Sequence, residues 1–273
     1  MSIGRAQTRD QTRDVLAYLR SKGVNALNLS ALYGLPLQTL QSFRDTLEQV
    51  VDMAPDRLAI TGYAHVPWMS KRQGAINEAD LPIRAKRLEM AAIAQRFLTA
   101  QGYVAIGTDH FTKSNDSLHK AAQKGRVGRN FQGYTDDQCD TLIGIGASAI
   151  SRFQQGYVQN AVATSAYQGR VSQTGLAGYK GYSMSRKDQF VARIIEDLLC
   201  GFTLRVDDLR QEFPDQTATI KATSAMLMQR YPDVFYVGNK GLVMQDWAKP
   251  LVRIIAQQVD QFSHPEIAHI AAI

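Results

Sequence analysis

The first half of the chain alternates between helix-like and strand-like patterns of apolar residues. A helix is predicted after Thr8, because Thr8 and Gln11 have the spacing of a capping box and apolar side chains recur at Val15, Leu16 and Leu19. Strands are predicted at 24–36, 57–62, 103–106 and 142–150, and further helices at 40–53 and 82–102, the latter opened by Pro82. Strands joined by crossover helices are typical of a parallel sheet, either open or closed into a barrel.

Unusual loops follow three of these strands. The loop at 63–67 contains His65, and residues 107–111 are predicted as a loop that carries Asp109 and His110. In α/β proteins, ligands bind at the carboxyl ends of parallel strands. We therefore expect functional side chains in these loops.

The second half of the chain is predominantly helical. Helices are predicted near 190–199, 206–213, 216–230 and 246–262, with a two-stranded hairpin over 234–244. Helices followed by a hairpin resemble a winged helix. The Gly-, Ser-, Gln- and Tyr-rich stretch 160–182 is interpreted as a connector or as a loop that faces the active site.

Composition narrows the class of protein. The 273 residues, 45% of them apolar, are enough for two domains. No apolar run reaches the ~18 residues of a membrane helix, and the polar start is unlike a signal peptide. The two cysteines, Cys139 and Cys200, are far apart, which favours the reducing cytoplasm. They are also too few to ligate an iron–sulfur cluster, which takes at least three thiolates.

Charge is uneven along the chain. The net charge is +6, yet residues 183–273 carry slightly more acidic than basic side chains. Basic residues concentrate in 111–134, where Asp116 is the only acidic side chain. This basic cluster consists of Lys113, Lys120, Lys124, Arg126 and Arg129. Such a cluster attracts phosphates or carboxylates through its field, or is simply a solvated loop.

Two segments carry candidate chemistry. The segment 129–135, RNFQGYT, combines directed donors with aromatic faces, which suits a planar anionic ligand. Asp109 beside His110 can orient an imidazole, although a structural histidine is an equal alternative. Cys139 lies near acidic residues that would raise its thiol pKa, and Cys200 lies on an apolar helical face typical of a core.

A family resemblance rests on five motifs in order. They are YGLP (33–36), YAHVP (63–67), DHF (109–111), RNFQGYT (129–135) and GIGASAIS (144–151). Together they resemble oxygen-independent coproporphyrinogen III oxidase, a radical S-adenosylmethionine (SAM) enzyme of haem biosynthesis. That family converts two propionates of coproporphyrinogen III to vinyl groups by oxidative decarboxylation, which gives protoporphyrinogen IX.

The resemblance implies an α/β fold and a domain organisation. Residues 1–160 are expected to form the C-terminal part of a radical-SAM, TIM-like barrel of parallel strands. Residues 161–182 would then be a connector, and 183–273 a mainly helical, winged-helix-like domain. We expect a truncated, misassigned or split form of the family chain.

The resemblance also implies cofactors. Members hold a [4Fe–4S] cluster on a CxxxCxxC motif, which this chain lacks, and two SAM molecules. By position, SAM contacts fall on Arg5, Ser30, Ala64 and Ile150, where Ser30 replaces a family aspartate. A serine hydroxyl binds ribose or ammonium groups more weakly than a carboxylate.

Substrate contacts are inferred at His110, Arg129 and Gln132, and no catalytic residue or metal ligand is assigned. The expected partners are coproporphyrinogen III or a related tetrapyrrole and an electron donor, with no nucleic acid and no membrane. The chain is expected to be a monomer unless another chain completes it.

Two alternatives stay open. A non-catalytic haem- or tetrapyrrole-binding protein could use His65, His110 or His119 as an axial ligand. A winged-helix nucleic-acid binder is disfavoured, because the C-terminal segment has no basic excess.

Overall fold

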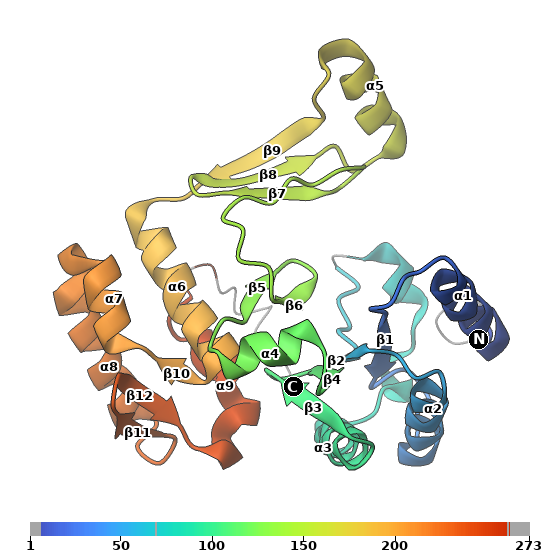
Figure 1. The fold of residues 1–273 in the computed structure, drawn as a ribbon, viewed down its shortest axis with the longest axis horizontal. Coiled ribbons are helices and arrows are strands. Elements are labelled where there is room, and N and C mark those ends of the chain that lie inside the picture. Colours follow the sequence, from blue (N-terminus) through green and yellow to red (C-terminus); the bar gives the residue numbers. More distant parts are fainter. Residues whose placement is uncertain (1–6, 69, 261, 263–273) are drawn as a thin grey trace.

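A four-stranded sheet organises the first part of the chain in this computed structural model, which describes residues 7–68, 70–260 and 262 (Figure 1). The sheet order is β1 (Asn28–Tyr33), β2 (Arg57–Gly62), β4 (His110–Lys113) and β3 (Tyr103–Ile106). β1 and β2 are parallel, whereas β4 is antiparallel to both β2 and β3.

The expectation of a wholly parallel sheet, with a loop over 107–111, is therefore wrong. The chain reverses directly after β3, because Gly107 adopts a φ of 58° that side-chain-bearing residues rarely take. The sequence from His110 to Lys113 then pairs back along β3 as the second strand of a hairpin. β1, β2 and β3 nevertheless run in the same direction, with β4 between β2 and β3.

Helices cover one face of this sheet. They are α2 (Leu40–Asp52) and α3 (Arg84–Ala100), whereas α1 (Arg9–Ser21) is joined to the end of α2 by an ion pair between Arg9 and Asp52. The predicted capping box of Thr8 and Gln11 is confirmed at the start of α1. Pro82 is not the first helical residue, because Ile83 is still extended, with ψ of 157°. The 3₁₀ turns at Lys71–Ala75 and Glu78–Asp80 lie between β2 and α3.

The strand residues alternate between this helical layer and the opposite face. Leu29 and Ala31 of β1 pack with buried residues of α2 and α3, and Leu58 of β2 is fully buried there. Ser30 and Leu32 lie on the other face and are exposed. β1 is the edge strand of this sheet, with β2 as its single neighbour among the described residues.

The middle of the chain forms a hairpin and a projecting arm. α4 (Ser117–Gln123) precedes the hairpin of β5 (Gly128–Asn130) and β6 (Gly133–Thr135). A separate antiparallel sheet then contains β7 (Ile150–Phe153), β8 (Gly156–Asn160) and β9 (Gly178–Ser183). Figure 1 shows this sheet, with α5 (Thr164–Thr174) at its end, standing away from the rest of the molecule. The stretch 161–182 thus contains a helix and most of a strand.

The predicted strand over 142–150 is wrong. Leu142 makes one isolated bridge to Arg152, and the regular strand begins only at Ile150. The intervening loop folds back so closely that a Cβ on Gly144 would lie 2.7 Å from the carbonyl oxygen of Ile150. The glycines of this segment therefore serve a turn against β7 and not a strand interior.

The last part of the chain surrounds one apolar core. Its helices are α6 (Arg186–Gly201), α7 (Val206–Glu212), α8 (Thr217–Arg230) and α9 (Val252–Ala256). A small antiparallel sheet has the order β10 (Thr203–Leu204), β12 (Gly241–Met244) and β11 (Phe235–Gly238). The predicted helix 246–262 is shorter than expected, because a 3₁₀ segment containing Pro250 spans Asp246–Leu251 before α9 begins.

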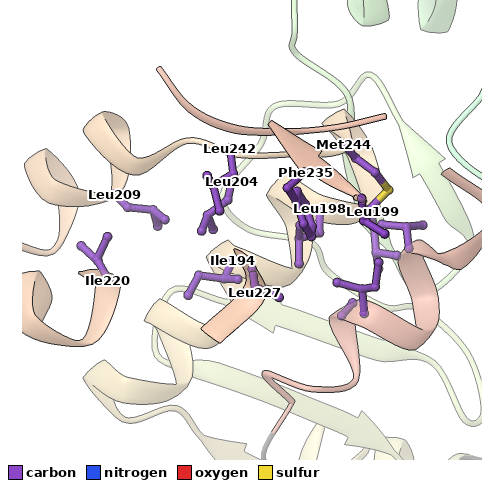
Figure 2. Close-up of a cluster of buried hydrophobic side chains, with 14 of the residues drawn as sticks. Ile194, Leu198, Leu199, Leu204, Leu209, Ile220, Leu227, Phe235, Leu242 and Met244 are labelled. Carbon is purple, nitrogen blue, oxygen red and sulfur yellow. The ribbon is translucent and has the colours of Figure 1, made fainter. Parts of the chain in front are cut away.

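Figure 2 shows how this core is filled from both helices and strands. Ile194 and Leu198 of α6 meet Leu227 of α8 and Phe235 of β11, and each is at most 3% exposed. None of the described helices is long and apolar enough to cross a membrane.

A cavity in this core is expected to lower the free energy of unfolding substantially. Leu198→Ala should lower the free energy of unfolding by about 2–5 kcal/mol, because Leu198 is fully buried and its neighbours cannot collapse completely. Leu176→Ala, at a side chain 77% exposed, should change it by less than about 0.5 kcal/mol. Urea titrations followed by circular dichroism would measure both; equal losses would contradict the assigned core.

Candidate functional site

An ionic chain crosses from the first part of the molecule to the last. Asp109 lies in the turn before β4, and its Oδ1 is 2.8 Å from Nδ1 of His110. Arg253 of α9 donates to the other carboxylate oxygen of Asp109. The Asp109 and His110 side chains are each 10% exposed. α9 thereby holds a carboxylate that lies 144 positions earlier in the sequence.

The ionisation of Asp109 follows from these contacts. Burial raises the pKa of Asp109, but the His110 hydrogen bond and the charge of Arg253 outweigh it, leaving the pKa below its ordinary value. An ionised carboxylate can only accept hydrogen bonds, so Nδ1 of His110 must carry the shared proton.

Tyr134 of β6 joins this histidine to the hairpin. The Tyr134 ring is buried and meets His110 edge-on, with ring centres 5.0 Å apart. The guanidinium of Arg129 lies 5.8 Å from the centre of the same ring. The Tyr134 hydroxyl donates to the carbonyl of Leu199 at 3.0 Å and accepts from the Thr108 amide at 3.3 Å. Burial raises the pKa of Tyr134, which keeps this donor protonated.

Two glycines make this packing possible. A Cβ on Gly107 would lie 2.0 Å from the Tyr134 ring, and one on Gly133 would lie 2.4 Å from Nε2 of His110. Both glycines have positive φ, 58° and 131°. The backbone of the hairpin therefore rests directly on the imidazole, as only glycine allows.

The tip of the hairpin points its functional groups outward. Phe131 is 54% exposed and packs edge-on against Tyr157 of β8 at 5.5 Å. The Asn130 side chain accepts the backbone N–H of Gln132 at 2.9 Å and so shapes the turn. In the described part of the chain, the exposed Gln132 amide has no hydrogen-bond partner. The structure thus brings His110 and Arg129 to one ring, and leaves Gln132 at the tip.

The residues expected to contact SAM come from separate elements. Arg5 lies outside the described residues. Ser30 is on the exposed face of β1, whereas the Ala64 carbonyl accepts from Gln73 at 3.2 Å and Ile150 begins β7. Within the described ranges, no hydrogen bond or ion pair joins Ser30, Ala64 and Ile150 to one another.

Ser30 and His110 do share one face of the sheet. Ser30 is paired with Ala59, and Ala59 with His110, so the three lie in one row across β1, β2 and β4. Two strand spacings separate Ser30 from His110, about 10 Å. Ser30 is exposed on this face, whereas His110 is buried beneath Gly133.

The basic cluster of 111–134 does not act as a unit. Lys113 binds Asp56 at 3.1 Å, and Asp116 is taken by Arg57 at 2.9 Å. Arg126 and Arg129 instead face a cleft beside α6. The sequence pattern alone could not separate these roles, because Asp56 and Arg57 lie in a distant segment.

The other two histidines in the described part of the chain lie on separate segments. The Nδ1 of His65 is 3.3 Å from the Tyr63 hydroxyl, and its Nε2 is 3.5 Å from Glu78. The buried Nδ1 of His119, on α4, has no partner among the described residues. No group of three or more potential metal ligands occurs in the described ranges.

The cysteines do not fit an iron–sulfur cluster. The sequence has two, and both are free thiols. A hydrogen bond with Asp137 raises the pKa of Cys139, as expected from its acidic neighbours. Burial raises the pKa of Cys200 to about 12. Two protonated thiols cannot replace the three or more thiolates of a cluster.

Known proteins resemble the chain along nearly its whole length. An oxygen-independent coproporphyrinogen III oxidase of Cereibacter sphaeroides is 41% identical over 272 residues, covering 99% of this chain and 60% of that protein. The oxidase of Paracoccus denitrificans is 36% identical over 271 residues, with the same coverage. No family model matches.

A solved structure agrees. Coproporphyrinogen III oxidase from Escherichia coli, described as a radical SAM enzyme, superimposes with a TM-score of 0.85 at 33% identity, covering 95% of this chain and 60% of that one. The resemblance found in the motifs is confirmed, together with a mixed α/β fold. This chain spans about three fifths of the length of these relatives.

The contact between Gly133 and His110 predicts a specific cost. Gly133→Ala should destabilise the protein by at least about 1 kcal/mol more than Gly146→Ala, because its new methyl group would collide with the imidazole. Gly146 also has positive φ, 107°, but open space around it, so it controls for backbone strain. Urea titration would measure the difference, and equal losses would contradict the close packing.

Asp109 predicts a pH dependence of stability. Because its folded pKa is lowered, its contribution is complete above the unfolded value near 3.9 and is lost as the pH falls through the folded value. Asp109→Asn should therefore cost about 3 kcal/mol at pH 7 and progressively less below pH 4.

Denaturant unfolding measured from pH 7 to pH 2 would test this. Asp10→Asn, at a carboxylate 78% exposed, is the control and should change stability little at any pH. A cost for Asp109→Asn that does not decrease in acid would contradict the ionised contact.

Proposed function

We propose that this chain supplies the tetrapyrrole-binding part of an oxygen-independent coproporphyrinogen III oxidase of haem biosynthesis. The observation that carries the proposal is the hairpin of residues 129–135, held on His110 by glycine packing while Phe131 and Gln132 stay exposed. The relatives of the chain are named as oxygen-independent coproporphyrinogen III oxidases, and the exposed hairpin is consistent with that function. A rigid support with exposed polar and aromatic groups is what an oriented ligand needs.

The finer architecture belongs to the same proposal. Residues 1–160 would be part of a TIM-like radical-SAM barrel, supported by the common direction of β1, β2 and β3 and by the free edge of β1. Residues 161–182 would connect it to a winged-helix-like domain at 183–273. The order α6, β10, α7, α8, β11, β12 supports that likeness.

In this function the chain's own residues bind and orient the substrate. Gln132 can donate its free amide to a propionate carboxylate, and Phe131 offers an aromatic face to the macrocycle. His110 packs against the hairpin backbone at Gly133, and the hydrogen bond from Asp109 holds the His110 ring in its orientation. These roles make His110 a positioning residue rather than a direct substrate contact.

Of the two cofactors that the family uses, the residues of this chain do not fit the [4Fe–4S] cluster and fit SAM in part. The [4Fe–4S] cluster has no ligand set in this sequence, so we derive no step through it here. SAM would meet Ser30 on the exposed face of β1, with Ala64, Ile150 and Arg5 as further proposed contacts. Because Ser30 carries no charge, we expect the second SAM molecule to bind more weakly than on the family's aspartate.

The radical reaction of the proposed function would also require an electron donor, and we expect it to take place in the cytoplasm. Residues 1–273 are proposed to bind the tetrapyrrole as a monomer.

The second candidate function is non-catalytic haem or tetrapyrrole binding. It is favoured by the buried Nδ1 of His119, which has no hydrogen-bond partner among the described residues. Under this alternative His110 is a poor axial ligand, because Asp109 holds Nδ1 and Gly133 covers Nε2. Among the described histidines, His65 or His119 would then be the candidate ligands.

A complementation assay distinguishes the two functions. The chain would be mixed with a separate polypeptide comprising the part of the Cereibacter relative that it does not cover, then reconstituted with iron, sulfide, SAM and a reductant. We expect protoporphyrinogen IX only from the mixture, and at least tenfold less with Gln132→Ala, since its amide would orient the propionate. Gln101→Ala, on the far end of α3, is the control.

Tetrapyrrole binding without conversion in the mixture would favour the second function. A mixture that neither binds nor converts would contradict both.

A further inference from the structure

A cleft lies between the base of the β5–β6 hairpin and helix α6. Its volume is about 590 Å³, within the range of small-molecule sites. Its walls also include Arg152 of β7 with its bridge partner Leu142, and Thr203 and Arg205 after α6. The turn of the hairpin, with Phe131 and Gln132, is not part of the lining, so the cleft is separate from the exposed tip.

The cleft has arginines on three of its walls. The complete set is Arg126, Arg129, Arg152, Arg193 and Arg205. Two of them are already neutralised: Arg193 and Arg205 both bind Asp197, whose side chain is fully buried. These two shape the wall and are not free for a ligand.

The other three arginines have no carboxylate partner among the described residues. Arg126 precedes β5, Arg129 lies in β5 and Arg152 lies in β7, so the charges come from the hairpin on one side and from β7 on the other. The facing carboxylates are partly engaged. Asp137 accepts the backbone N–H of Cys139 at 3.0 Å, and Glu196 accepts that of Arg129 at 3.4 Å.

This arrangement selects a type of anion. Five arginines and four carboxylates line the cleft, so its net charge is only slightly positive and a dense charge such as pyrophosphate gains little there. Guanidinium groups on separate elements suit single charges that are spread apart, and they match carboxylates in bidentate geometry. Asn130 and Thr135 add neutral donors to the same walls.

We propose that this cleft is a carboxylate-binding site in which Arg126, Arg129 and Arg152 hold propionate groups of a tetrapyrrole. The identity of the ligand rests on the proposed function, since each pyrrole ring of coproporphyrinogen III carries a propionate. The hairpin would then contact the ligand twice, with Gln132 at its tip and the arginines at its base.

The test is a fluorescence titration of the full chain with coproporphyrin III, the stable oxidised analogue, and with its tetramethyl ester. Arg126→Met and Arg152→Met should each raise the Kd for coproporphyrin III about tenfold, the effect of one charge-assisted contact. Neither variant should change the weaker Kd for the ester. Arg230→Met, at an exposed arginine on the last turn of α8, is the matched control and should leave both values unchanged.

Several results would overturn the proposal. They are equal Kd values for the acid and the ester, no effect of either arginine variant, no binding of coproporphyrin III by the wild type, or displacement by pyrophosphate at equal concentration. Circular dichroism of each variant would show that folding is retained.

The outcome is separable from that of the proposed function. Loss of binding in Arg152→Met without conversion in the complementation assay would keep the cleft and reject the enzyme. Conversion that is unaffected by Arg126→Met and Arg152→Met would support the enzyme and reject the cleft as the carboxylate site.

Discussion

The burial of the Tyr134 ring is the constraint on which the rest of the site depends. Its edge meets His110, its face carries Arg129, and its hydroxyl bonds to Leu199 of α6. Each hydrogen bond is worth only about 1 kcal/mol, but a buried phenol that lost its partners would cost more. The ring can occupy this position only because Gly107 has no side chain. One side chain thus fixes the hairpin relative to both the sheet and α6.

Two buried carboxylates complete this arrangement by electrostatics. Asp109 is held by His110 and Arg253, and Asp197 by Arg193 and Arg205. Buried ion pairs add little net stability compared with apolar packing, whereas removal of one partner is costly. Their effect is therefore to select one geometry. Asp109 fixes α9 against the turn before β4, and Asp197 fixes the wall of the cleft.

Short-range patterns in the sequence are sufficient to predict features that depend only on neighbouring residues. The capping box of Thr8 and the strand at 57–62 depend on neighbouring residues, and the structure confirms both. The reversal at Gly107 was missed because pairing of β4 with β2 and β3 is a long-range property. The 142–150 segment was misassigned because apolar glycine-rich runs suit both a strand and a tight turn.

In the functional site, too, local patterns identify some residues, whereas long-range contacts cannot be predicted from them. His110, Arg129 and Gln132 could be chosen from residue type and motif, but not their different surroundings. Arg253 carries no local signal, since an arginine on a C-terminal helix is ordinary until Asp109 is found beside it. In the proposed function, the same distinction separates binding from chemistry. Binding depends on packing and charge that this chain contains, whereas the radical step depends on cluster ligands that two protonated cysteines cannot provide. In the proposed function, recognition of the tetrapyrrole is therefore separable from the radical step.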